Sequence, residues 1–321
     1  MTTTYVPFKV ASMAKDRKKA SGERSRRYAP AGVPIEAAKL PAGLYLVATP
    51  IGNLADITLR ALEVLAAADV IACEDTRVTR KLTEHYGIAT PLTPYHEHNA
   101  AEARPKILAR LARGEAVALV SDAGTPLISD PGYKLVRAAQ DAGHAVTAIP
   151  GASSVLTALN VAGLPTDRFF FEGFLPAKQA ARQKRISALA SIPATLVLFE
   201  SGPRLAATLA DLAEGLGSRA AAICRELTKL HEEVRRGGLT SLARNYAQGG
   251  ETRGEIVIVV APPEEAETQS ADVDDMLRRA LARVSLKDAV GEVALASGRS
   301  RREVYQRALE LTKGEGDGAA R

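Results

Sequence analysis

Residues 116–132 read AVALVSDAGTPLISDPG, an apolar run followed directly by a polar run rich in glycine and proline. The first five residues, Ala116–Val120, predict a buried strand. Connections in α/β proteins usually take about 2–6 residues, whereas Ser121–Gly132 is twelve residues long. A loop of this length and composition is typical of a ligand-binding loop, so we predict that the chemistry of the protein lies after this strand.

Similar apolar runs recur on both sides of this segment. They lie at Leu44–Ala48, Val70–Cys73 and Ala145–Ile149, with a weaker one near Leu92–Tyr95. The stretches between them repeat apolar residues at helical spacing. Alternation of short apolar strands with amphipathic helices indicates a parallel sheet covered by helices, and we predict a first α/β domain over residues 42–162.

A second α/β domain is predicted over residues 163–262. Its candidate strands are Phe169–Phe171, Thr195–Phe199, Ala220–Cys224 and Ile256–Val260. Residues 261–270 are rich in proline and glutamate and read as a linker, which we place at residues 263–272. The fold class expected for the main body is therefore α/β with two domains.

Three short helices are predicted over residues 273–313. Ser285 and Ser300 each precede a carboxylate by three residues, close to the capping-box pattern. Gly298 between the last two helices predicts a tight turn and a helix-turn-helix-like unit. The unit carries Arg299, Arg301, Arg302 and Arg307, which are candidate RNA contacts, the alternative being a solvated basic face.

The positive charge of the chain is concentrated at its start. The net charge is +5, of which residues 1–40 contribute +6 and the rest −1. Residues 1–41 lack apolar periodicity and are predicted to be a disordered basic tail. Such an arm could bind a polyanion such as RNA, or it could be a solvated start without a function.

Composition excludes several classes of protein. No stretch approaches the roughly 20 apolar residues of a membrane span, and no signal-peptide segment is visible. Cys73 and Cys224 both lie inside apolar runs, so we expect buried thiols rather than a disulfide. We predict a cytoplasmic protein without membrane contact.

Five segments follow predicted strands of the first domain, where ligands bind in open α/β sheets. They are residues 49–54, 74–77, 95–99, 121–132 and 150–154. His96 and His98 could suggest a metal, but no matching Cys or His set exists elsewhere, and we predict none. A Walker A lysine motif, a Gly-x-Gly-x-x-Gly turn and a Gly-x-Ser-x-Gly elbow are all missing, which weighs against nucleoside triphosphatases, standard dinucleotide enzymes and hydrolases.

Several of these segments occur together in an order that resembles one known family. The motifs are LYLVATPIGNLADIT at 44–58, EDTR at 74–77, SDAGTP at 121–126, DPG at 130–132 and PGASS at 150–154. Between about Gly43 and Pro262 the chain resembles the ribosomal RNA small subunit methyltransferase I family. These enzymes have the tetrapyrrole-methylase fold and methylate the ribose 2′-oxygen of a cytidine in 16S ribosomal RNA.

The resemblance implies S-adenosyl-L-methionine as methyl donor, a donor cleft between the two α/β domains, a homodimer and the small ribosomal subunit as substrate. It assigns donor binding to Pro50, Gly52, Asn53, Ser121, Asp122, Ala123, Gly124, Thr125, Ser129, Ser153 and Ser154. Tetrapyrrole methylases proper tend to show Gly-Pro-Gly-Asp-Pro after the first strand. This chain has Thr-Pro-Ile-Gly-Asn at 49–53, which favours the ribosomal RNA branch.

The sequence does not identify the base that would accept the hydroxyl proton. Candidates are His96 in the first domain and Glu200, Glu226 and Lys229 in the second, in segments that also match the family (200–204 and 225–229). Glu74 and Arg77 are either part of the site or a structural ion pair.

Two other functions remain open from the sequence. One is a methyltransferase of the same fold acting on a tetrapyrrole or another small molecule. The other is a non-enzymatic helix-turn-helix regulator with an α/β ligand-binding domain. The basic ends of the chain disfavour the first, and the reactive-looking segments of the second domain disfavour the second.

Overall fold

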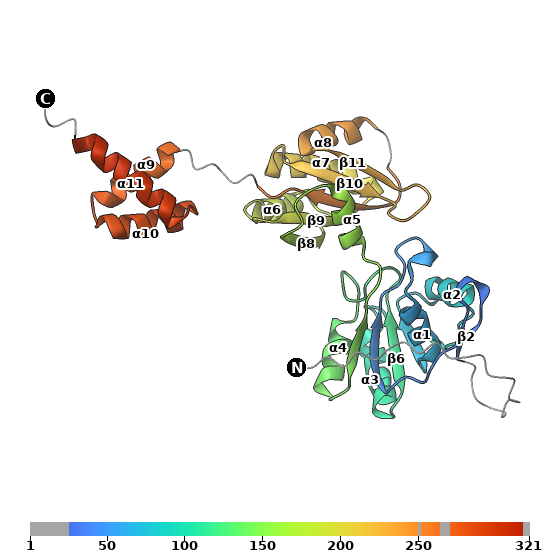
Figure 1. The fold of residues 1–321 in the computed structure, drawn as a ribbon. Coiled ribbons are helices and arrows are strands. Elements are labelled where there is room, and N and C mark those ends of the chain that lie inside the picture. Colours follow the sequence, from blue (N-terminus) through green and yellow to red (C-terminus); the bar gives the residue numbers. More distant parts are fainter. Residues whose placement is uncertain (1–25, 250–251, 264–269, 317–321) are drawn as a thin grey trace, which may run out of the picture. The chain divides into compact units, whose positions relative to one another are not determined.

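The computed structural model describes residues 26–249, 252–263 and 270–316. The chain divides into two units, residues 1–154 and 155–321. The second unit contains an α/β domain and a set of three C-terminal helices (Figure 1).

The first domain is built on a five-stranded parallel sheet in the order β5-β4-β6-β3-β7. The strands are β3 (Gly43–Val47), β4 (Val70–Cys73), β5 (Leu92–Pro94), β6 (Ala116–Val120) and β7 (Val146–Ile149). Four helices connect them, α1 (Leu59–Ala67), α2 (Thr76–His85), α3 (Ala100–Ala112) and α4 (Tyr133–Asp141). The alternation predicted from the sequence is confirmed, with strand bounds within about two residues.

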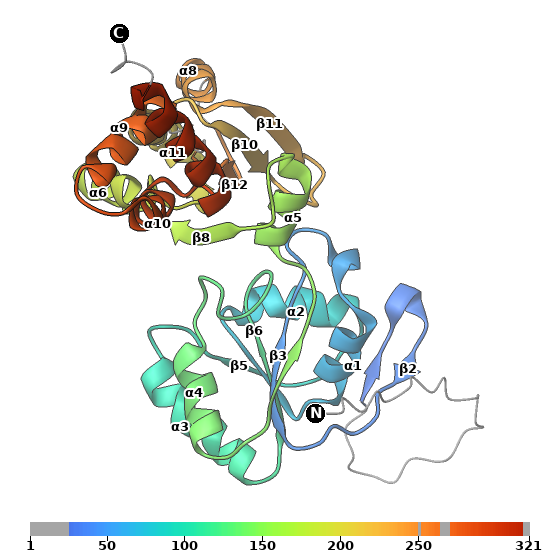
Figure 2. The same cartoon turned by 60° about the vertical axis from the view of Figure 1, so that its left-hand side comes forward.

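Helices cover both faces of this sheet (Figure 2). Leucines of α1 and α2 pack on one face, and those of α3 and α4 pack on the other. Neighbouring strand residues alternate between the two cores: Leu44 joins one cluster and Tyr45 the other, as the period of two in a strand requires. The domain is therefore doubly wound.

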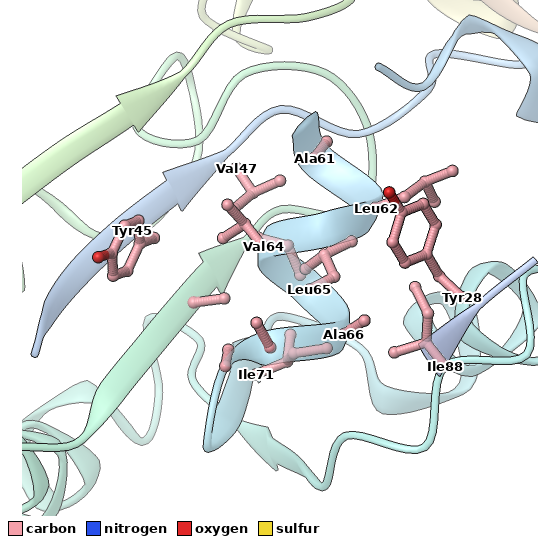
Figure 3. Packing of buried hydrophobic residues seen from close by; sticks show 14 of the residues in the cluster. Tyr28, Tyr45, Val47, Ala61, Leu62, Val64, Leu65, Ala66, Ile71 and Ile88 are labelled. Atoms are coloured by element: carbon pink, nitrogen blue, oxygen red, sulfur yellow. The ribbon is translucent and has the colours of Figure 1, made fainter. Parts of the chain in front are cut away.

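Residues 26–41 differ from the predicted disordered tail. Strands β1 (Arg27–Tyr28) and β2 (Ile35–Glu36) pair antiparallel around the short 3-10 helix η1 (Pro30–Gly32). Tyr28 is 3% exposed and belongs to the same core as α1, and Figure 3 shows it beside Leu62. Burial of this aromatic ring fixes the segment, so the ordered domain begins before residue 42. The rest of the predicted tail, residues 1–25, lies outside the described residues.

The second domain holds a mixed sheet in the order β11-β10-β12-β9-β8, in which only β8 and β9 run parallel. Its strands are β8 (Phe169–Phe174), β9 (Thr195–Ser201), β10 (Ala220–Arg225), β11 (Glu233–Gly238) and β12 (Glu255–Val260). Helices α6 (Gln179–Leu189), α7 (Gly202–Leu216) and α8 (Leu239–Gln248) pack into one core with it. Strand β11 was not predicted from the sequence.

Helix α5 (Ser154–Ala162) lies almost wholly in the second unit, whereas the sequence assigned residues up to 162 to the first domain. The reason is its contacts. The Cys224 thiol lies 4.0 Å from the Ala158 carbonyl, and the Arg236 guanidinium donates to the carbonyls of Val161 and Ala162. The division between the units therefore falls at Ser154.

The C-terminal helices are α9 (Ser270–Leu281), α10 (Leu286–Ser297) and α11 (Arg301–Gly316), and they share one apolar core. Ser285 and Ser300 cap these helices, each accepting a backbone N–H three residues on. The reciprocal bond of a capping box is present at Ser300, whose N–H donates to Glu303, whereas at Ser285 the hydroxyl donates to Asp288. Gly298 ends α10 in the left-handed conformation. Helix α9 begins inside the predicted linker, of which residues 264–269 lie outside the described residues.

Cys73 and Cys224 are both buried free thiols, and burial raises the pKa of each, to about 11 for Cys224. No helix in the described ranges is long and apolar enough to cross a membrane.

Candidate functional site

Strands β3 and β6 are neighbours in the sheet, but the chain leaves them in opposite directions. From β3 it crosses to β4 by α1, and from β6 it crosses to β7 by α4 on the other face. Such a topological switch point is where open α/β sheets bind ligands, at the carboxyl ends of the strands. All five loops singled out in the sequence leave this edge, because the five strands are parallel.

The loops after β3 and β6 are hydrogen-bonded to each other at the switch point. The Thr49 N–H donates to the Gly124 carbonyl at 2.9 Å, and the Gly124 N–H donates back at 3.1 Å. The Thr49 hydroxyl donates to the Ser121 carbonyl at 3.2 Å, and the Thr125 hydroxyl donates to Ala152 in the loop after β7 at 3.3 Å. Three loops that are distant in the sequence are thus tied together.

The loop Ser121–Gly132 has an unusual backbone. Leu127 and Ser129 adopt φ of 74° and 64°, and Gly124 adopts φ of 75°. Non-glycine residues rarely occupy this left-handed region, and each costs of order 1–3 kcal/mol that the surroundings must offset. Such conformations cluster at ligand-binding loops, which supports a binding role for this loop.

Carboxylates gather on the same loops. Burial is the main cause that raises the pKa of both Glu74 and Asp130, and the charge of Asp122 raises each further. One oxygen of Asp122 accepts the Asp75 N–H at 2.9 Å. A partly buried group of like charges favours a cationic ligand, because a nearby positive charge would stabilise the ionised carboxylates. Glu74 and Asp130 were not among the predicted donor-binding residues, although both lie in the quoted motifs.

The remaining predicted donor-binding residues line the same edge. Gly52, Asn53, Ala123, Thr125 and Ser129 are exposed, whereas Ser121 is buried and Gly124 lies against Ile51. Asn53 caps the short 3-10 helix η2 (Leu54–Asp56) by accepting the Ala55 N–H. Pro50, Ser153 and Ser154 are half-buried. The structure therefore brings the loops of the first domain to one edge of the sheet, where some of the predicted donor-binding residues are exposed and others are buried.

Glu200 is enclosed by its own domain. It is 2% exposed and its carboxylate accepts from the Ser201 N–H at 2.8 Å and the Thr208 hydroxyl at 2.6 Å. Arg204 lies 3.3 Å from it. A carboxylate held in this way stabilises the junction of β9 and α7.

Glu226 and Lys229 bind each other. The Lys229 ammonium donates to Glu226 at 2.9 Å and to Glu255 at 2.9 Å, and the Glu255 N–H also donates to the Glu226 carboxylate. The hydrogen bond from the Glu255 backbone is the largest cause that lowers the pKa of Glu226. Burial acts to lower the pKa of Lys229, but its two carboxylate partners outweigh it and raise it. The lowered pKa makes the Glu226 carboxylate a weaker base, and the raised pKa keeps the Lys229 ammonium protonated, so neither residue is well suited to accept a proton.

His96 differs from these three residues. It lies in the loop after β5, at the same edge as the loops of β3, β4 and β6. Its backbone N–H donates to the Asn99 side chain at 2.9 Å. Its ring nitrogen Nδ1 is buried without a hydrogen-bond partner among the described residues, and the ring of exposed His98 is 6.1 Å away. Within the described ranges no three metal-ligating side chains form a group.

The four arginines of the C-terminal helices fall into two kinds. Arg299, Arg301 and Arg302 are exposed, at the turn before α11 and at its start. Arg307 makes two 2.7 Å hydrogen bonds to Asp274 on α9 and a third to Glu310. Arg307 therefore joins two helices of the bundle, a role that its position in the sequence did not reveal because Asp274 is 33 residues away.

The first domain is doubly wound with the candidate loops at its switch point, and the second domain holds a mixed sheet. The family model of tetrapyrrole (corrin/porphyrin) methylases matches residues 43–243, and a model described as the RsmI C-terminal HTH domain matches residues 267–312.

Curated relatives identify one particular family within the tetrapyrrole methylases. Proteins named ribosomal RNA small subunit methyltransferase I match from Mesorhizobium japonicum (54% identity, covering 88% of this chain and 98% of the relative) and Pseudomonas aeruginosa (46%, 83% and 96%). The one from Escherichia coli O157:H7 is 45% identical, with coverage of 83% and 94%. The chain belongs to the ribosomal RNA small subunit methyltransferase I family.

Solved structures agree on the fold. A conserved hypothetical protein from Aeropyrum pernix K1 superimposes with a TM-score of 0.55 at 21% identity, covering 86% of this chain and 98% of that chain. A diphthine synthase gives 0.53 at 20% identity, covering 68% and 89%. At these identities the likeness concerns the fold.

Proposed function

We propose that this protein transfers the methyl group of S-adenosyl-L-methionine to the ribose 2′-oxygen of a cytidine in 16S ribosomal RNA of the small ribosomal subunit. The observation that carries the proposal is the 54% identity, over 88% of the chain, to a relative named ribosomal RNA small subunit methyltransferase I. The geometry of the first domain is compatible with it.

The loops at the switch point fit the donor. S-adenosyl-L-methionine carries a sulfonium, an ammonium and a carboxylate, and when bound it supplies an electrophilic methyl group. Glu74, Asp122 and Asp130 offer negative charge to the cationic groups of the donor. Those positive charges would in turn reduce the repulsion among the three carboxylates. The hydroxyl of the exposed Ser129 and the backbone N–H groups of the loop can hold the carboxylate.

The reaction itself requires position and a proton acceptor. The methyl–sulfur bond breaks as the methyl–oxygen bond forms, and the hydroxyl proton leaves. Holding donor and hydroxyl in line can supply about 7–11 kcal/mol in favourable cases. Among the four candidate bases we favour His96, because its Nδ1 lacks a partner in the described part of the chain while Glu200, Glu226 and Lys229 are engaged.

Substrate contact is assigned to the C-terminal helices. Arg299, Arg301 and Arg302 lie at the turn and start of α11, where exposed guanidinium groups can bind phosphate. Arg307 serves the fold of this unit through Asp274. A homodimer and a cytoplasmic location complete the proposal and rest on the family resemblance. Exposed apolar side chains such as Phe174 (58%) and Leu230 (94%) are compatible with a second copy.

A methyl-transfer assay tests the function. The protein is incubated with S-adenosyl-L-methionine labelled in its methyl group and with purified small ribosomal subunits, naked 16S ribosomal RNA or a tetrapyrrole. Label in the ribosomal RNA, in a nuclease-resistant 2′-O-methylcytidine linkage, is the expected result. Label in the tetrapyrrole alone would replace the RNA substrate by a small molecule, and no label anywhere would favour a binding protein.

A further inference from the structure

The outer face of helix α2 is strongly cationic. Arg77, Arg80 and Lys81 lie in its first two turns and are all exposed, whereas Thr79 and Leu82 face the core. Helix α2 leaves the sheet directly after β4, so this face begins at the same edge as the donor-binding loops (Figure 2).

The arrangement is electrostatically unfavourable for the helix alone. The amino end of a helix carries partial positive charge and prefers acidic side chains; the N-cap Asp75 supplies one and pairs with Arg77, but the first turn of α2 contains no further acidic residue to offset Arg80 and Lys81. No carboxylate of the described ranges lies within ion-pair distance of Arg80 or Lys81, the nearby Glu84 included. Within the described residues, Arg80 and Lys81 therefore lie without an acidic partner, next to a third cation, Arg77.

Arg77 is fixed rather than free. Its guanidinium makes a fork with Asp75, at 2.6 Å from Nη2 to Oδ2 and 3.1 Å from Nε, rather than with Glu74, one of the two alternatives that the sequence left open. The Arg77 side chain is nevertheless 86% exposed. Asp75 in turn donates its N–H to Asp122 of the Ser121–Gly132 loop. Asp122 and Asp75 therefore connect the cationic face to the donor loop.

We propose that the face formed by Arg77, Arg80 and Lys81 is a second RNA-binding surface, which holds the phosphate backbone of the substrate beside the donor-binding loops. The inference rests on the proposed function. It assigns RNA contact to the first domain, in addition to the arginines of the C-terminal helices.

Charge complementarity selects the partner. Three cations on successive turns present point charges and planar guanidinium donors along a line, which suits the repeating phosphates of RNA. S-adenosyl-L-methionine carries a single carboxylate, so its binding would need at most one of these three cations. The direct connection through Asp75 also suits a surface that must place a ribose near the donor, since small misplacements of reacting groups slow catalysis strongly.

Salt-dependent binding tests this surface. The variant R80Q/K81Q is compared with the unchanged protein for binding to transcribed 16S ribosomal RNA and to purified small subunits over a range of salt concentrations. We expect affinity for both to fall roughly tenfold, and the slope of log affinity against log salt to decrease by about 0.7 for each lost phosphate contact. Donor affinity, measured by calorimetry, should not change.

The matched control is K184Q/R244Q, which removes two exposed cations from α6 and α8 of the second domain. It should leave the slope unchanged. An unaltered slope in R80Q/K81Q would overturn the proposal, and so would loss of binding to subunits but not to naked RNA, which would indicate a ribosomal protein as partner. Because binding is read without catalysis, the surface and the methyl-transfer activity can fail separately.

Discussion

Two loops of this molecule share an uncommon backbone but use it differently. The Ser121–Gly132 loop after β6 and the loop after β10, residues 226–232, each hold two non-glycine residues at positive φ: Leu127 and Ser129 in the first, Glu226 and Thr228 in the second. In the first loop burial and like charges raise the pKa of Asp130. In the second, hydrogen bonds lower the pKa of Glu226.

The difference lies in whether the charged group of each loop has a partner of opposite charge. Glu226 has its partners within its own domain, in Lys229 and the Glu255 backbone. Asp130 is crowded by Asp122 and would gain from an external cation. Backbone strain alone therefore does not mark a binding site; the state of the neighbouring charges decides between the two roles.

The largest expected effect comes from Gly124→Val in the first loop. Gly124 has φ of 75°, and a Cβ there would lie 3.4 Å from Ile51. A β-branched residue is strained in this conformation and would disturb the pairing with Thr49. We expect donor binding to be lost in calorimetry. Gly143→Val is the control, since Gly143 has φ of 77° but open space around it; equal loss of donor affinity in both would mean that strain alone is responsible.

His96→Gln should act on the rate. If His96 accepts the hydroxyl proton, kcat should fall by about 10²–10⁴-fold, with donor affinity unchanged. His98→Gln changes the neighbouring exposed ring and should have little effect. A kcat within twofold of the unchanged enzyme for His96→Gln would exclude this residue as the base.

Glu226→Ala should act on stability instead. It removes the partner of the Glu255 N–H and one partner of Lys229, and we expect a loss of about 1–2 kcal/mol in the free energy of unfolding. Glu255→Gln removes the other carboxylate partner of Lys229. Because the Glu255 side chain is 78% exposed, we expect a loss of less than about 1 kcal/mol in the free energy of unfolding. Loss of donor affinity in Glu226→Ala, measured on the folded protein, would show instead that the two loops share a function.

The smallest effects concern pH, and they have opposite signs in the two loops. Folding lowers the pKa of Glu226, so its contribution to stability is present above its ordinary value of 4.5 and is lost as the pH falls through the folded pKa. Folding raises the pKa of Asp130, so ionisation costs stability as the pH rises from 3.8 through the folded pKa.

Urea unfolding at about pH 7 and about pH 3 measures both contributions. Asp130→Asn should stabilise the first domain at neutral pH and leave it nearly unchanged in acid. Glu226→Gln should destabilise the second domain at neutral pH and matter little in acid. Effects of the same sign would contradict the assignment of one open and one self-contained loop.

Local pattern predicted most of the first domain. Val70–Cys73 and Ala116–Val120 are strands with the predicted bounds, because strands buried on both faces read as continuous apolar runs. Strand β11 was not predicted, because Val234 is its one large apolar residue. Its hydrogen bonds to β10, rather than its composition, make it a strand.

Contacts between distant residues could not be predicted in the same way. Arg307 was expected to bind RNA but pairs with Asp274, and α5 was placed in the first domain but contacts Cys224 and Arg236 of the second. Each partner lies more than 30 residues away in the sequence. No periodicity encodes such pairs, because they depend on how the elements pack.

The sequence by itself determined the family, the parallel α/β order and the long loop after β6, because these follow from ordered motifs and from apolar runs whose spacing is local. Only the tertiary structure decided which charges are available. In the part of the chain that the structure describes, Glu226 and Arg307 lie among partners that neutralise them, whereas Asp130, Arg80 and Lys81 do not. The reason is physical: the free energy of a charge is fixed by what surrounds it in space, and neighbours in space are set by packing rather than by order along the chain.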